Sequence, residues 1–202
     1  MEFARVLRRR RMIRAYDEGR PVPPEALDAV LAAALRAPSA GFTQGISFLV
    51  LSLAAEREAF WGVTGETVTG KAEGAWLRGM RTAPILILVW TSDEAYLDRY
   101  AEPDKGWTDR DPVRWSAPYW FVDAGMASMA ALLAAVDQEL GACFFGIPTD
   151  RITSVREAFE VPASQLSVGV ISLGYPVPAP AIGSPTRRPR KAPSELVHRG
   201  IW

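Results

Sequence analysis

Two groups of basic side chains lie near opposite ends of the 202-residue chain. The first holds Arg10, Arg11 and Arg14, which would share about one face of a helical turn. The second includes Arg188 and Arg190. A guanidinium group grips phosphate through two parallel hydrogen bonds, whereas the plain alternative for each group is a solvated basic face. The two ends of the chain could therefore meet around one anion.

A run of small residues, Pro38 to Gly41, follows a predicted helix and ends it sharply. Small side chains let backbone N–H groups come close to a ligand. The plain alternative is an ordinary turn.

Several other catalytic constellations are disfavoured. His198 is the only histidine and Cys143 the only cysteine, so a Ser-His-Asp triad, a zinc helix or a Cys/His metal cluster is improbable, and no internal disulfide can form. Cys143 lies in an apolar run, which favours a buried structural thiol. Residues 65–71, GETVTGK, have the glycine and lysine spacing of a phosphate-binding loop, but Ala72 replaces the required hydroxyl and no strand precedes them. We interpret that match as chance.

Charge and apolar patterning limit the partners of the protein. Lys+Arg and Asp+Glu number 23 each, so no net field favours nucleic acid or an anionic membrane. The N-terminus has no apolar segment typical of a secretory signal, and the single cysteine is usual in the cytoplasm. The longest apolar stretch, 119–140, contains charged residues and predicts a core helix ending at Gly141 rather than a membrane span.

Length and composition predict one domain over residues 1–202, and the order of helices and strands fits an α+β or mixed α/β domain with helices on a sheet. Residues 91–118 have little periodicity and many aromatic side chains, so we expect an excursion or lid there. The proline-rich residues 176–202 predict an extended arm. The remaining segments predict helices over 23–37, 119–140 and 152–159, and strands over 47–51, 84–90, 142–147 and 166–173.

Five segments, taken in order, resemble the FMN-dependent nitroreductase family: 10–16, 36–41 with Gln44, 139–147, 173–176 and 188–198. The resemblance implies a nitroreductase-like fold, in which a central, mostly antiparallel mixed sheet is flanked by helices. It also implies a homodimer, in which the extended C-terminal arm reaches the partner subunit. The segments at about 54–81 and 91–118 are not matched.

The resemblance also implies a site. The phosphate of FMN would be held by Arg10, Arg14, Arg188 and Arg190, with Arg11 along the ribityl and pyrimidine side. The partner subunit would contribute its copy of the turn to the flavin. The flavin-binding set is Arg10, Arg11, Met12, Arg14, Pro38, Ser39, Ala40, Gly41, Phe42, Gln44, Phe145, Gly146, Ile147, Arg188 and Arg190, of which Phe145 to Ile147 would line the isoalloxazine ring.

Four positions depart from the family pattern. Met12 stands where the family usually has serine, Phe42 where asparagine is common, and Gly45-Ile46 replaces the usual Pro-Trp. Phe42 would stack near the flavin, narrow the substrate cleft or pack in the dimer core. We also expect Trp115 and Trp120, with Trp107 and Tyr119, to form an aromatic wall over the flavin or to pack in the core.

The implied activity is transfer of a hydride from NAD(P)H through bound FMN to a nitroaromatic, quinone or similar conjugated acceptor, by a ping-pong mechanism. Such chemistry needs no catalytic side chain and no metal. Two alternatives stay open on the same fold: a deazaflavin-linked, dehalogenating or flavin-consuming relative, or a flavin-binding protein that stores or senses the cofactor. A binding domain with two solvated arginine clusters is the plainest alternative.

Overall fold

A four-stranded antiparallel sheet forms the centre of the protein. The computed structural model describes residues 2–64, 74–178 and 188–202. The strands are β1 (Ile46–Leu51), β2 (Ile85–Thr91), β3 (Gly141–Phe145) and β4 (Leu166–Gly174), in the spatial order β1-β2-β4-β3. Strand β2 is buried along its whole length, as its unbroken apolar run predicted. The lookalike phosphate loop, 65–71, lies outside the described residues.

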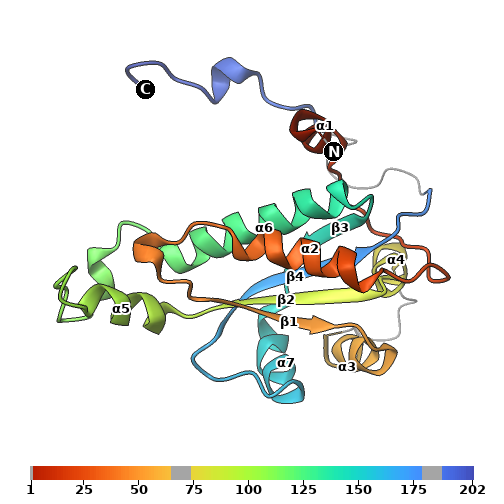
Figure 1. Ribbon diagram of the computed structural model, residues 1–202, viewed down its shortest axis with the longest axis horizontal. Helices are drawn as coiled ribbons and strands as arrows, with labels where there is room; N and C mark the ends of the chain where they lie inside the picture. Colours follow the sequence, from red (N-terminus) through yellow and green to blue (C-terminus); the bar gives the residue numbers. More distant parts are fainter. Residues whose placement is uncertain (1, 65–73, 179–187) are drawn as a thin grey trace.

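Helices cover both faces of the sheet, so the molecule has three layers (Figure 1). On one face lie α2 (Pro24–Leu35) and α6 (Tyr119–Asp137), and on the other lie α3 (Ala54–Thr64), α4 (Ala75–Arg81) and α7 (Ile152–Ala158). The α+β class is therefore confirmed. The remaining described helices are α1 (Phe3–Arg9), α5 (Asp93–Ala101) and the short turns η1 (Ala40–Phe42), η2 (Pro112–Arg114), η3 (Thr149–Arg151) and η5 (Pro193–Glu195).

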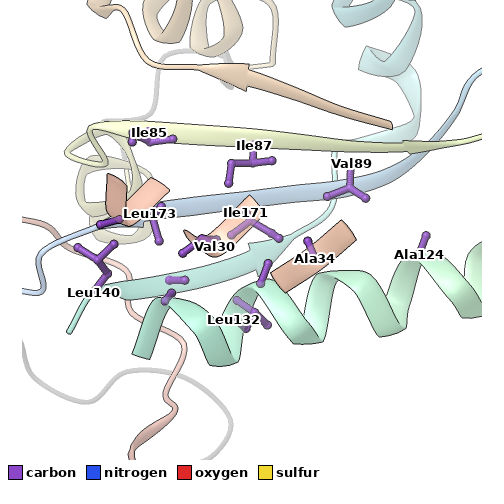
Figure 2. Packing of buried hydrophobic residues seen from close by; sticks show 14 residues of the cluster. Val30, Ala34, Ile85, Ile87, Val89, Ala124, Leu132, Leu140, Ile171 and Leu173 are labelled. Carbon is purple, nitrogen blue, oxygen red and sulfur yellow. The ribbon is translucent and has the colours of Figure 1, made fainter. Parts of the chain in front are cut away.

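Alternation along β2 divides the core in two. Ile85, Ile87 and Val89 point to the α2 and α6 layer, where they meet Val30 and Ala34, spaced one turn apart on α2 (Figure 2). The intervening residues of β2 face α3, α4 and α7. Each fully buried aliphatic side chain contributes roughly 1.5–3 kcal/mol to the free energy of unfolding.

Helix α6 is long and apolar enough to cross a membrane by length and composition alone. In the structure it packs against α2 and the sheet, and it buries the polar residues Asp123 and Ser128 on that side. This packing is that of a core helix, as the sequence predicted. Its end differs from the prediction: Glu139, not Gly141, takes the left-handed conformation (φ 60°) after the helix. Gly141 begins β3, where the side chain of Ile13 leaves no room for a Cβ atom.

The N-terminal arginines do not share a helical turn, which corrects the sequence prediction. Helix α1 ends at Arg9, and the following segment is extended: Met12 bridges Ala142 in a parallel pair, and Ile13 N donates to Ala142 O at 2.9 Å. The edge of β3 offers unpaired backbone groups, and these bonds satisfy some of them. Tyr16 then fixes the segment to β4, because its buried hydroxyl lies 2.7 Å from Ser172 Oγ.

Residues 91–118 contain more regular structure than the sequence indicated. Helix α5 begins after Ser92, whose hydroxyl oxygen accepts a hydrogen bond from Ala95 N, and its residue Tyr96 is fully buried. The residues after the helix return toward α6 through η2. At the other end of the chain, residues 188–202 are exposed and extend away from the three layers (Figure 1).

Candidate functional site

A cavity of about 410 Å³ opens at the C-terminal end of β3. Strand β3 and the two residues after it bring Phe145, Gly146 and Ile147 to one wall, so three residues predicted from the sequence lie together at this cavity. A volume of this size is within the range of small-molecule and cofactor sites. The other lining residues come from α3, α4 and the start of η3: Phe60, Trp61, Thr64, Gly74, Trp76, Leu77 and Pro148.

Aromatic rings form the walls of this cavity. The rings of Trp61 and Phe145 are nearly parallel, with centroids 5.9 Å apart, and Trp76 meets Phe145 edge to face at 5.7 Å. Trp61 is buried and its Nε1 has no hydrogen-bond partner among the described residues, which is costly for an N–H group unless a ligand supplies an acceptor. The cavity therefore suits a flat conjugated molecule with a polar edge.

Gly146 leaves the cavity open. A Cβ atom built on this residue would meet no other atom within 4 Å, although the glycine lies between two larger lining residues. The empty volume beside the backbone at this point is what a ring lying close to the chain requires.

The three arginines of the first group do not lie at one site: Arg11 lines a different hollow from the aromatic cavity, and Arg10 and Arg14 have separate surroundings. Arg10 is half-buried, and its Nη1 is buried with no hydrogen-bond partner in the described part of the chain. Arg14 donates to Met12 O at 3.3 Å and lies near Cys143: burial raises the pKa of the thiol, and the Arg14 charge partly offsets this increase. The raised pKa agrees with a structural thiol. Arg11 instead donates to the carbonyl oxygens of Arg8 and Arg10, and lines a separate hollow of about 110 Å³.

Met12 has a structural position. Its backbone pairs with β3, and its side chain is half-buried and packs against the apolar clusters on both faces of the sheet. A serine here would lose this packing. This packing accounts for a methionine at a position where the family usually has serine.

The turn from Pro38 to Gln44 lies beside α5, at the end of the molecule away from α1 (Figure 1). Gly41, Phe42 and Gln44 have φ angles of 62°, 55° and 55°, which is unusual for the two larger residues. Phe42 is 77% exposed. Within one chain, the turn is not among the residues that line the cavity. Pro38 and Gln44 are exposed, and Ser39 and Ala40 half-buried.

The aromatic residues of the excursion pack mainly on one another. Trp115 is central, with Tyr100 at 4.4 Å, Trp107 and Tyr119 at 5.5 Å, and Trp120 at 6.4 Å between ring centroids. Neither Trp115 nor Trp120 lines the 410 Å³ cavity of the same chain. A wall over a flavin would thus have to form across a subunit interface.

The second arginine group is not brought to the first within the described chain. Arg188 and Arg190 are exposed on the C-terminal segment. Neither side chain forms a hydrogen bond or an ion pair with a described residue. Their assignment to a phosphate stays a prediction.

The site gains residues that sequence reasoning missed. Trp61 and Trp76 lie in segments that matched no family block, so no motif pointed to them. The amphipathic spacing of 54–64 indicates only that Phe60 and Trp61 face inward. The contacts of Trp61 and Trp76 with Phe145 join residues far apart in the chain, so the sequence pattern does not show them. Among the described residues, no three His, Cys, Asp or Glu side chains lie together in a group that could hold a metal ion.

Comparisons with known proteins identify the family of the chain. The family model described as "Nitroreductase family" matches residues 7–175. A protein of Methanothermobacter thermautotrophicus named "Putative NADH dehydrogenase/NAD(P)H nitroreductase" is 29% identical over 182 residues, which is 89% of this chain and 80% of that protein.

Solved structures show the same fold. A protein from Desulfovibrio desulfuricans described as a "putative nitroreductase in complex with FMN" has a TM-score of 0.71 and 24% identity, over 100% of this chain and 98% of that chain. Another, from Exiguobacterium sibiricum and also in complex with FMN, has a TM-score of 0.73 and 19% identity, over 98% and 97% of the two chains. With its family match over most of its length, this chain belongs to the nitroreductase family and is an oxidoreductase.

Proposed function

We propose that this protein is an FMN-dependent oxidoreductase that passes a hydride from NAD(P)H to a nitroaromatic, quinone or similar conjugated acceptor in a ping-pong cycle. The observation that carries the proposal is the aromatic cavity against Phe145, Gly146 and Ile147. FMN, when bound, supplies the hydride chemistry, and the protein supplies binding and orientation. The FMN complexes of two structural neighbours support this choice of cofactor.

The cavity would hold the isoalloxazine ring. Phe145 and Ile147 would contact its faces or edges, the open space at Gly146 would admit it close to the backbone, and Trp61 and Trp76 would complete the aromatic enclosure. The unpaired Nε1 of Trp61 would gain an acceptor from the polar edge of the ring. Apolar walls also exclude water from the reacting atoms.

Arginine side chains would hold the rest of the cofactor. Arg10 offers a buried donor without a partner, and Arg14 lies on the same extended segment. Arg11 would serve the ribityl and pyrimidine side, with Met12 beside it. Arg188 and Arg190 would reach the phosphate through the C-terminal arm, 176–202. Charge-assisted bonds to a dianion are strong enough to order such a segment.

A second subunit would complete the site. Helix α6 exposes Val122, Met126 and Met129 at a spacing of four and three residues, and the half-buried Leu133 and Val136 continue the line. An apolar seam of this spacing suits packing against another helix surface. The partner subunit would then contribute the turn formed by Pro38, Ser39, Ala40, Gly41, Phe42 and Gln44, and the wall formed by Trp115 and Trp120.

We further propose that residues 1–202 act as one cytoplasmic domain, with 91–118 as a lid over the acceptor. Phe42, Trp115 and Trp120 would then be the side chains nearest the substrate. Phe42 is the best placed of them, because its ring is largely exposed on a turn with a fixed backbone.

An absorbance experiment tests the function. The purified protein is mixed with FMN, freed of excess flavin and reduced anaerobically with NADPH or NADH before an acceptor is added. The proposal predicts a yellow protein that bleaches with a reduced nicotinamide and regains colour with menadione or a nitroaromatic. A yellow protein that does not bleach would favour a deazaflavin-linked or storage role. A colourless protein would contradict flavin binding altogether.

A further inference from the structure

We infer that Asp123 and Tyr96 form a positioning pair that fixes the Ser39–Gln44 turn in the conformation in which it meets the flavin of the partner subunit. The functional part of this inference rests on the proposed function. Both residues of the pair belong to one chain, Asp123 on α6 and Tyr96 on α5. Neither helix contributes a residue to the lining of the cavity.

The contacts of Asp123 are specific. Its carboxylate is on the first turns of α6 and the residue is 1% exposed. Oδ2 accepts one hydrogen bond from Ala40 N at 2.7 Å and another from the hydroxyl of Tyr96 at 2.8 Å. A buried carboxylate is stable only where donors reach it, so the pair and the turn depend on each other. The buried acidic partner also raises the pKa of the Tyr96 phenol, after the larger effect of burial itself.

The turn needs such an anchor because its backbone is strained. Phe42 and Gln44 both have left-handed φ angles of 55°, which side chains with a Cβ atom rarely adopt. Further bonds fix the same turn: Arg99 Nε donates to Gly41 O at 2.8 Å, and Gln44 N donates to Ser39 Oγ at 3.0 Å. A Cβ atom at Gly41 would collide with the ring of Tyr100.

The result of this anchoring is exposure. Phe42 is 77% exposed although its backbone is held from both sides. A large ring held outward in a strained conformation contributes little to the stability of its own chain. Contact with another molecule would account for the strain, and the proposed partner site is such a contact.

The aromatic cluster of 91–118 supports the pair from behind. Trp115 lies 6.1 Å from Tyr96 and 4.4 Å from Tyr100 between ring centroids, and Trp120 lies 6.3 Å from Tyr96. These rings pack against Tyr96, whose hydroxyl donates to Asp123. Within their own chain, Trp115 and Trp120 would thus support the turn through Tyr96, in addition to the wall that they are proposed to form toward the partner subunit.

Hydrogen exchange and flavin affinity together test the inference on the full-length protein. The variants are Asp123→Ala, which removes both acceptor bonds, Asp123→Asn, which keeps an oxygen acceptor, and Tyr96→Phe, which removes one hydroxyl. Ser128→Ala is the matched control: Ser128 is also buried on α6, but its hydroxyl donates to Ala124 O of the same helix. Exchange is followed in peptides spanning 38–45, and FMN dissociation constants by flavin fluorescence.

Asp123→Ala is expected to speed exchange in 38–45 and to weaken FMN binding, each about tenfold or more, because a hydrogen bond to a charged group is lost. Asp123→Asn should restore most of both, Tyr96→Phe should show a smaller change, and Ser128→Ala should match the wild type. If Asp123→Ala does not fold, Tyr96→Phe carries the test.

Wild-type exchange and wild-type FMN affinity in folded Asp123→Ala or Tyr96→Phe would overturn the inference. Equal losses in Ser128→Ala would also overturn it, because they would trace the effect to general weakening of α6. Failure of the proposed function has a different signature: the wild type itself would bind no FMN. In that case the exchange of 38–45 alone decides whether the pair anchors the turn.

Discussion

Arg10 carries a buried donor that a bound anion would satisfy. Its Nη1 is buried and lacks a partner among the described residues, whereas the neighbouring Arg8 is exposed on α1. A buried donor without an acceptor lowers the free energy of unfolding, since water is lost and nothing replaces it. A dianion at this place would remove that cost. Replacing Arg10 can therefore distinguish a role in ligand binding from a role in folding.

Replacing Arg10 by methionine keeps the apolar stem and removes the guanidinium. We expect the melting temperature to stay the same or rise, while the affinity for FMN falls by about tenfold or more, because a charge-assisted bond is worth about 1.5–3 kcal/mol. Thermal unfolding and FMN titration measure the two effects, with Arg8→Met as the control. A lower melting temperature with unchanged FMN affinity would show that Arg10 is structural.

Sequence reasoning reached the residues of the site unevenly. Phe145, Gly146 and Ile147 were predicted and do line the cavity, because their segment follows a strand that has a family pattern. Trp61 and Trp76 were missed, since only tertiary packing brings α3 and α4 to the end of β3. Arg188 and Arg190 are exposed on the C-terminal segment of the single chain, so their place at the phosphate stays a prediction.

At the scale of elements, the extended segment after α1 is held against the sheet by Tyr16. Its hydroxyl is buried, donates to Ile13 O at 2.7 Å and lies 2.7 Å from Ser172 Oγ on β4. The segment carries Arg10, Arg11 and Arg14, so this tyrosine helps to place the first arginine group. Burial raises the pKa of the Tyr16 phenol above its ordinary value of 10.0.

The raised pKa predicts how stability depends on pH. The folded state keeps the phenolic proton above pH 10, where the unfolded chain loses it, so this contribution is fully present below pH 10 and declines as pH rises. Each such tyrosine adds up to about 1.4 kcal/mol per pH unit to the decline. Urea unfolding between pH 8 and 11 should show a shallower decline for Tyr16→Phe than for the wild type. Identical pH dependence in the two proteins would contradict the buried, protonated phenol.

The strands and long helices could be predicted because their periodicity is strong. The segments 84–90 and 166–173 were expected as buried strands and correspond to β2 and β4 within one residue at each end. The extended course of 10–16 was not predicted, because arginines spaced for a helix also suit a strand edge, and only the free backbone groups of Ala142 decide between them. Helix α5 was not predicted, because the aromatic and charged residues of 91–118 show little periodicity and Ser92 was not recognised as a helix cap.

At the scale of the whole molecule, the exposed seam of α6 favours a dimer. Met126 and Met129 are 39% and 40% exposed in the single chain, on the side of α6 that faces away from the core. A second copy that covers the seam would bury these side chains. It would also bring a second turn, with its exposed Phe42, to the molecule.

A charge in the seam should separate the subunits. Met126→Glu is expected to convert a dimer of two 22.1 kDa chains into monomers and to lower FMN affinity in parallel, because burying an unpaired carboxylate is costly. Light scattering and FMN titration measure the outcomes. Leu53→Glu, at a residue 63% exposed beside α3, is the control. A monomeric wild type that binds FMN tightly would contradict the shared site.

The most direct test of a flavin in the β3 cavity is to fill the space beside Gly146. A Cβ atom there meets nothing within 4 Å, so Gly146→Val should fold like the wild type and place its side chain where the ring is proposed to lie. Gly62→Val, at an exposed glycine of α3 with equally free surroundings, is the control. FMN titration of the apoprotein, followed by flavin fluorescence, is the measurement. The account predicts that Gly146→Val keeps the wild-type melting temperature but loses FMN affinity by about a hundredfold, whereas wild-type FMN affinity in Gly146→Val would contradict it.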